Sequence, residues 1–395
     1  MGLFKEVKKP VIRSAASGAG VSALRPAYVA KTAPCIHSCP SGTDVRGWLV
    51  AVAQHEAYGR TPAQAFEQAW RAIMERNPFP AICGRVCQHP CELNCNRKAK
   101  DGPVAVNHLE QFIGDFAIAQ GLRTALAAPR RTDAPRIAIV GAGPAGLAAA
   151  YHLARKDFAV TLIDAGPQPG GMMRYRIPDA VIPHAVLDAE IGNILGLGVD
   201  LRPGCTVGRD VAVEELQKSY QLIFFAMGLQ KAAQLEIRPG ASGSAALIGE
   251  LPAELPEFPP EDEAKPAPRV LNTVSVAIAQ GQAVAEAIAA YLSGDGKAPA
   301  VSSAIIRSEK LKLDWYPAAQ RSDGETPMTE SEALAEAARC MSCGMCMDCE
   351  TCWMYCSKNC FVKLPKGEHY KIKIDLCNGC GKCVESCPCG YIEMK

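Results

Sequence analysis

Two short apolar runs separated by a helical segment form the clearest pattern in this 395-residue chain. Arg136 to Val140 reads RIAIV and Ala159 to Ile163 reads AVTLI. Runs of this length and composition are typical of buried parallel strands. The alanine-rich segment between them, LAAAYHLARKD, predicts a helix. Near the end of the chain, Tyr370 to Asp375 alternates like one strand of a hairpin.

Changes in pattern along the chain suggest a multidomain α/β protein. Residues 239–268 are rich in proline, glycine and acidic residues, and we expect a linker there. The boundaries that we predict are an extended arm that could wrap a partner (1–30), a helical region (31–132), a Rossmann-like region (133–293), a connector (294–335) and a cysteine-rich α+β module (336–395).

Charge and composition exclude several classes of protein. A net charge of +1 argues against a nucleic-acid partner. No window approaches 18 uninterrupted apolar residues, so we expect no membrane span, and no apolar stretch of a secretory signal follows MGLFKEVKKP. Nineteen cysteines indicate either disulfides or metal. We expect a reducing cytoplasm, and therefore thiolates that bind iron. No Ser-His-Asp set, Walker loop or carboxylate pair suggests other catalytic groups.

Twelve of the cysteines lie in the last 56 residues, and eight of them form two similar runs of four. The second run, Cys-x2-Cys-x2-Cys-x3-Cys-Pro, is the ligand pattern of a bacterial-type two-cluster [4Fe-4S] ferredoxin, in which the fourth cysteine of each run binds the other cluster. We therefore expect one cluster on Cys346, Cys349, Cys352 and Cys387, and a second on Cys377, Cys380, Cys383 and Cys356. A zinc ribbon is the alternative, although zinc sites use separated CxxC pairs. Four cysteines stay unassigned: Cys340, Cys343, Cys360 and Cys389.

A glycine-rich turn joins the first apolar run to the helix. The turn reads Gly141-Ala142-Gly143-Pro144-Ala145-Gly146, and Asp164 closes the second apolar run. Strand, glycine turn, helix, strand and acid, in this order, predict a Rossmann dinucleotide site. Gly141 permits the tight turn, Gly143 lets the backbone approach the pyrophosphate, and Gly146 allows close helix packing. Asp164 would accept hydrogen bonds from a ribose.

The segment after this acid resembles the small subunit of glutamate synthase and its flavoprotein relatives. It reads GGMMRYRIP, and the resemblance implies that FAD, rather than NAD, lies along it, near Gly170, Gly171, Met172, Arg174, Ile177 and Pro178. LIFFAMG, which ends at Gly228, is similar to the family's ATG-type strand. The segment from Thr273 to Ile288 is similar to the helix whose N-terminus faces the flavin, although alone it would also suit a plain surface helix.

The resemblance fails between Gly228 and Leu271. Relatives carry a second Rossmann unit for NAD(P)H there, but this chain has only about forty residues, without a second GxGxxG. The Gly-Asp pair that relatives place before the last helix is also missing. We therefore expect that NAD(H), if it binds, reaches the flavin through other surfaces, or that the electron donor is a protein.

The N-terminal cysteines form a third group. Cys83, Cys87, Cys91 and Cys95 recur every fourth residue, which predicts thiols close enough to share a cluster. The segment from Pro78 to Cys95 resembles the [4Fe-4S] domain of the same family, with structural zinc as the alternative. That resemblance implies one cluster on Cys39, Cys87, Cys91 and Glu110, and leaves Cys35, Cys95 and Cys83 for a second. Two upstream cysteines of the family are missing, because residues 1–34 contain none.

The C-terminal module resembles the delta-type ferredoxin of thiamine-diphosphate-dependent 2-oxoacid oxidoreductases. Fused to the flavoprotein-like part, it looks like the FAD subunit of a 2-oxoacid:NAD complex, of which phenylglyoxylate dehydrogenase is one type. The resemblance implies catalytic and ferredoxin-like partner subunits, three or four [4Fe-4S] clusters, one FAD, and NAD as final acceptor. The alternatives are a separate NAD(P)H:ferredoxin reductase, a sulfite-reductase-linked oxidoreductase, or a scaffold with a degenerate flavin site.

Overall fold

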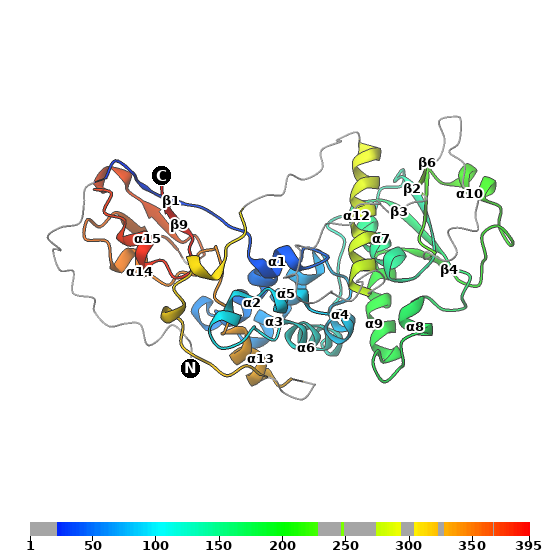
Figure 1. Ribbon diagram of the computed structural model, residues 1–395. Helices are drawn as coiled ribbons and strands as arrows, with labels where there is room; N and C mark the ends of the chain where they lie inside the picture. Colours follow the sequence, from blue (N-terminus) through cyan, green and yellow to red (C-terminus); the bar gives the residue numbers. More distant parts are fainter. Residues whose placement is uncertain (1–21, 228–245, 249–273, 294–303, 323–327, 366) are drawn as a thin grey trace, which may run out of the picture.

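Three parts of the chain lie in a row (Figure 1). The computed structural model describes residues 22–227, 246–248, 274–293, 304–322, 328–365 and 367–395. A group of short helices occupies the middle of the row, with a parallel sheet and its helices on one side and a small cysteine-rich module on the other. No helix in these described ranges is long and apolar enough to cross a membrane.

The helical part packs around aromatic residues. Its helices are α1 (Pro34–Ser38), α2 (Val45–Ala53), α3 (Pro62–Met74), α4 (Pro80–Val86), α5 (Pro90–Leu93) and α6 (Val106–Ala119). Thr61 and Gln64 form a capping box that starts α3. Phe66 of α3 is fully buried and meets the rings of Phe112 and Phe116 edge-on, at centroid distances of 5.0 and 5.4 Å.

Two glycines let α4 and α6 touch backbone to backbone. A Cβ on Gly84 would lie 2.3 Å from the backbone nitrogen of Gln111, and one on Gly114 would lie 2.3 Å from that of Ala81. No other residue fits at such a crossing, because real Cβ atoms do not approach this closely. This contact brings the cysteines at the end of α4 close to Glu110 of α6.

The sheet is parallel, with strand order β4-β3-β2-β5-β6. Its elements are β2 (Arg136–Val140), α7 (Pro144–Arg155), β3 (Ala159–Ile163), α8 (Met172–Tyr175), α9 (His184–Leu195), β4 (Asp200–Arg202), α10 (Val213–Ser219), β5 (Leu222–Phe225), β6 (Ala246–Ile248) and α12 (Val274–Ser293). The predicted strands at β2 and β3 and the helix between them are confirmed. The predicted linker contains β6, and its remaining residues lie outside the described ranges.

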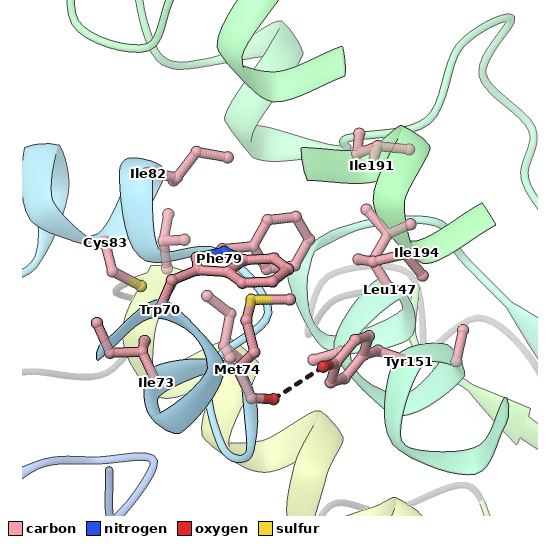
Figure 2. Close-up of a cluster of buried hydrophobic side chains, with 14 of the residues drawn as sticks. Trp70, Ile73, Met74, Phe79, Ile82, Cys83, Leu147, Tyr151, Ile191 and Ile194 are labelled. Carbon is pink, nitrogen blue, oxygen red and sulfur yellow. Dashed lines mark hydrogen bonds between the residues drawn. The ribbon is translucent and has the colours of Figure 1, made fainter. Parts of the chain in front are cut away.

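The helical part and the sheet part share one hydrophobic core (Figure 2). Side chains of α3 and α4, among them Trp70 and Ile82, meet Leu147 of α7 and Ile194 of α9. The hydroxyl of Tyr151 on α7 donates to the backbone oxygen of Met74 at 2.9 Å, which is the dashed line in the figure. The shared core holds the two parts at a fixed relative position.

The C-terminal module contains a hairpin and a strand that pairs with the start of the described chain. Its elements are α14 (Thr351–Met354), β7 (Phe361–Lys363), β8 (Tyr370–Ile372), α15 (Lys382–Ser386) and β9 (Ile392–Met394). Helix α13 (Glu330–Ala337) leads into the module but packs in the core of the helical part. Strands β7 and β8 form the predicted antiparallel hairpin. Strand β1 (Pro26–Tyr28), from the predicted arm, pairs antiparallel with β9 (Figure 1). The described end of the arm thus covers this chain's own module.

Hydrogen bonds attach the module to the helical part. Gln54 after α2 donates to the backbone oxygen of Met347 at 2.6 Å, and the Tyr58 hydroxyl donates to Asp348 at 2.9 Å. Glu336 of α13 accepts from the backbone nitrogen of Ala105 at 2.8 Å. These contacts are buried or partly buried, so the module is fixed against the helices rather than hanging from its connector.

Candidate functional site

The glycine turn after β2 has the geometry that a dinucleotide site requires. Gly141 has a φ of +112°, and a Cβ there would lie 2.5 Å from the backbone oxygen of Ala226. A Cβ on Gly146 would lie 1.9 Å from the oxygen of Gly141. Gly143, by contrast, has room, since the nearest atom to its added Cβ is 4.0 Å away. No side chain caps the N-terminus of α7, which begins at Pro144, so this helix end has no side-chain acceptor where a phosphate would bind.

Asp164 lies beside this turn, at the end of β3. One of its carboxylate oxygens accepts from the backbone nitrogen of Ala142 at 2.6 Å, and the other accepts from that of Gly166 at 2.7 Å. Each oxygen keeps a further lone pair, so the carboxylate can still accept from a ribose hydroxyl. Asp164 also fixes the shape of the glycine turn, which its predicted role did not include.

The GGMM segment lies directly against the turn. The Gly170 nitrogen donates to the oxygen of Ala142 at 2.8 Å, and a Cβ on Gly171 would lie 2.7 Å from the Cα of Gly143. Met172 is exposed and begins α8. Ile177 is half-buried and Pro178 is exposed. Two predicted cofactor residues, Gly228 and Thr273, lie outside the described residues.

Arg174 is placed differently from the other residues of this segment. Its guanidinium is buried, forms an ion pair with Asp188 of α9, and donates to the Pro169 oxygen at 2.7 Å. Because its guanidinium is bound to these partners, Arg174 stabilises the loop. It contributes to a cofactor site only by holding this loop in place. The sequence could not show this, because Asp188 comes from the next helix.

Cys39, Cys87, Cys91 and Glu110 come together in a group that we name site A. Burial and the Glu110 carboxylate raise the pKa of Cys39, and burial, Glu110 and Cys39 raise that of Cys87 to about 11. Burial raises the pKa of Cys91 well above its usual value, with Cys39 and Cys87 as the nearest charged neighbours. Three thiols and one carboxylate that shift one another's pKa values form a donor set that suits an iron cluster.

Glu110 is held in site A by a hydrogen bond from Asn77. The Asn77 side-chain nitrogen donates to its carboxylate at 3.0 Å. Burial raises the pKa of Glu110 to about 7, and the hydrogen bond from Asn77 opposes this shift. Cys83 lies in the wall of the site: its thiol donates to the Asn77 oxygen at 3.6 Å, and it faces Glu110 and Cys87.

The four regularly spaced cysteines do not share one site. Cys95 lines a separate cavity with Cys35, Cys340 and Cys343, which we name site B. Sequence reasoning left Cys340 and Cys343 unassigned, because their partners lie at the other end of the chain. One signal was present: the resemblance lacks two N-terminal cysteines, and the C-terminal module has a surplus.

The C-terminal cysteines form two groups with the expected exchange of the fourth member. Burial, Cys349, Cys346 and Cys387 raise the pKa of Cys352, and these four cysteines are site C. Site D is Cys356, Cys377, Cys380 and Cys383, which line one cavity together with Cys360. Burial and the other three thiols raise the pKa of Cys383 to about 12, against the hydrogen bond from the Val384 amide. The Cys389 sulfur lies 3.8 Å from that of Cys387, at the edge of site C.

Two segments of the chain match known families. Residues 3–122 match the family described as dihydropyrimidine dehydrogenase domain II, 4Fe-4S cluster. Residues 139–191 match the NAD(P)-binding Rossmann-like domain. The chain therefore contains an iron–sulfur domain followed by a Rossmann-like nucleotide-binding domain. Both matched segments end before the C-terminal module.

Similar proteins are subunits of oxidoreductases. The NADP(+)-dependent formate dehydrogenase subunit beta of Moorella thermoacetica is 34% identical over 52% of this chain and 31% of its own length. The dihydropyrimidine dehydrogenase subunit PreT homolog of Salmonella typhi is 33% identical over 53% and 49%, respectively. The glutamate synthase [NADPH] small chain of Mycobacterium tuberculosis is 33% identical over 52% and 40%. The chain thus spans about half the length of these relatives, or less.

Proposed function

We propose that this chain is an electron-transfer subunit of a larger oxidoreductase, in which FAD and [4Fe-4S] clusters pass electrons between a partner subunit and NAD. One observation carries the proposal: site A adjoins the nucleotide-binding part. The Cys87 thiol is hydrogen-bonded to Ser275, at the start of α12. Gly281 of the same helix packs on α7, where its Cβ would lie 2.1 Å from the Ala145 oxygen.

The residues present suit both kinds of cofactor. A flavin accepts two electrons together and can release them singly, whereas each cubane carries one. The glycine turn and the N-terminus of α7 would hold the pyrophosphate, and Asp164 would orient a ribose. Buried thiols at sites A, C and D would hold the clusters and keep water from them.

FAD is proposed over NAD because of the GGMM segment. It packs on the glycine turn with two consecutive positive-φ glycines, at 126° and 51°. The matched family is described only as NAD(P)-binding, and it ends at residue 191. This match does not distinguish FAD from NAD, so the choice of FAD depends on the resemblance of the GGMM segment to the flavoproteins. A reducing location such as the cytoplasm agrees with cysteines that are all free.

The host complex is proposed from the C-terminal module. Its likeness to the delta-type ferredoxin favours a 2-oxoacid oxidoreductase such as phenylglyoxylate dehydrogenase. A second candidate, a separate NADPH-linked reductase, is favoured by similar proteins such as the NADPH-Fe(3+) oxidoreductase subunit beta of Geobacter sulfurreducens, 32% identical over 52% of this chain.

Anaerobic purification of the full chain from its native cells tests the proposal. We expect a yellow-brown protein with bound FAD, several [4Fe-4S] clusters and co-purifying 2-oxoacid oxidoreductase subunits. Photoreduction of the flavin should produce the electron paramagnetic resonance (EPR) signals of reduced clusters. Protein without flavin, or with zinc in its cysteine sites, would contradict the proposal. A chain that purifies alone and is reduced by NADPH would favour the second candidate.

A further inference from the structure

Site B is built from both ends of the chain. Cys35 lies on α1 and Cys95 follows α5, whereas Cys340 and Cys343 follow α13. All four line one cavity, and apolar side chains such as Leu49 complete its wall. Arg46 lines the same cavity and donates to the backbone oxygen of Cys343, 297 positions along the chain, at 2.7 Å.

The four thiols lie close enough to one another to shift each other's pKa values. Burial and the thiols of Cys340, Cys343 and Cys95 raise the pKa of Cys35 well above its usual value. Burial and the thiols of Cys340 and Cys95 raise that of Cys343 to about 12. All of them are free cysteines. Four partly buried thiols around one hollow form a donor set of the kind that binds a metal cluster.

Buried arginine nitrogens near the cavity also lack an acceptor. Within the described residues, the Nε atoms of Arg46 and Arg339 are buried and have no hydrogen-bond partner. Such orphaned donors are rare in folded proteins. Arg46 faces Cys35, Cys340 and Cys343, and Arg339 faces Cys95. Arg46 lines the cavity, so its unpaired Nε offers a cationic donor to an anionic group bound there.

We propose that Cys35, Cys95, Cys340 and Cys343 bind a [4Fe-4S] cluster, with two ligands from the helical part and two from the C-terminal module. The inference deepens the proposed function and rests on it for the role of the cluster. A single zinc ion fits less well, since Zn–S bonds near 2.3 Å bring four sulfurs within about 4 Å of each other. Within the described residues, the four sulfurs of site B do not all lie within 4.8 Å of one another. This spacing is wider than a single zinc ion requires.

Site B connects site A to site C. On one side, Cys35 of site B lies close enough to Cys91 of site A to raise its pKa. On the other side, Tyr316 is buried and faces Cys343 of site B and Cys349 of site C. Its hydroxyl donates to the Met341 oxygen at 2.7 Å, and Met341 and Met347 pack around it. The cluster at site B carries electrons between the helical part and the C-terminal module.

Alanine variants of the full chain, purified without oxygen, test the site. We expect Cys35→Ala and Cys340→Ala each to lose about four iron atoms and the same EPR signal, because both remove one [4Fe-4S] cluster. The double variant should lose no more iron than either single variant. Cys205→Ala, in a separate cluster of apolar residues, should keep all iron. Loss of about eight iron atoms from the double variant, loss of zinc instead of iron, or full iron in either single variant would overturn the site.

Cys343→Ser covers the case in which the alanine variants do not fold. A serine oxygen can replace the thiolate, so we expect retained iron and a shifted signal from one cluster. An unchanged spectrum would overturn the site. Iron content does not depend on electron transfer. If the iron results agree but reduced flavin fails to reduce the clusters, site B stands and the proposed relay falls.

Discussion

At the residue scale, Gly143 and Gly146 share one turn but face different surroundings. The nearest atom to an added Cβ is 4.0 Å away at Gly143 and 1.9 Å away at Gly146. The protein without cofactor therefore has room for a side chain at Gly143. We infer that a glycine is needed there so that a ligand can approach the backbone. Gly146 serves the fold itself, because α7 could not leave the turn at this angle with any larger residue.

Replacing Gly143 with Val separates binding from folding. The side chain would fill the space that a pyrophosphate needs, so we expect FAD affinity to fall at least about tenfold, or about 1.4 kcal/mol. Iron content should stay unchanged. FAD retained after desalting, measured against iron, is the test, with Gly192→Ala on α9 as a control, since nothing lies within 4 Å of its added Cβ. Unchanged FAD in Gly143→Val would place the nucleotide elsewhere.

At the element scale, α9 caps α4 across the boundary between the sheet and the helical part. Glu190 of α9 accepts from the backbone nitrogens of Ala81 and Ile82, at 2.7 and 3.3 Å. Burial raises the pKa of Glu190 to about 8, although these two amides oppose the shift. The capping bond thus connects the two parts at the helix that leads to site A.

Glu190→Gln should flatten the pH dependence of stability. The pKa of a glutamate in the unfolded chain is about 4.3, below that of Glu190 in the folded chain, so the folded chain binds the Glu190 proton more tightly. The contribution of the protonated Glu190 to the free energy of unfolding is complete below about pH 4.3, and it decreases as the pH rises towards about 8. Between pH 6 and 8 we expect the thermal midpoint of the parent to fall, and that of Glu190→Gln to fall less. Circular dichroism melting curves measure this, with exposed Glu67→Gln as a control. Parallel curves would show that Glu190 does not titrate in this range.

At the scale of the whole molecule, the beginning of the described chain covers the cysteine groups of sites C and D. Tyr28 of β1 stacks on Tyr391, with ring centroids 5.1 Å apart, and its hydroxyl donates to the Tyr370 oxygen at 2.7 Å. Burial and the thiols of Cys352 and Cys346 raise the pKa of Tyr28. Pro26 of the same strand lines the cavity of site D. The described end of the arm therefore covers part of sites C and D.

Tyr28→Ala should make the clusters proposed at sites C and D sensitive to oxygen. Removal of the ring opens a path from solvent to site C, so we expect cluster absorbance to bleach several-fold faster in air. Tyr28→Phe keeps the stacked ring and loses only the hydroxyl, and should behave like the parent. Equal bleaching of the alanine variant and the parent would show that the arm does not protect the clusters.

The sequence predicted those parts of the fold and sites that depend on local spacing. The glycine turn, its flanking strands, and the grouping of Cys346, Cys349 and Cys352 with Cys387 follow from short motifs. The partners of Cys340 and Cys343 could not be predicted, because they lie at the other end of the chain and no spacing rule reaches that far. The pairing of β1 with β9 was missed for the same reason, since the arm was expected to be free for another protein.

The meeting of the two ends of the chain also has a consequence for biosynthesis. Cys35 and Cys95 leave the ribosome long before Cys340 and Cys343, because the latter two lie far downstream in the chain. The cavity of site B is therefore complete only after Cys343 has been translated. A product that stops before Cys340 would carry only two of its four thiols.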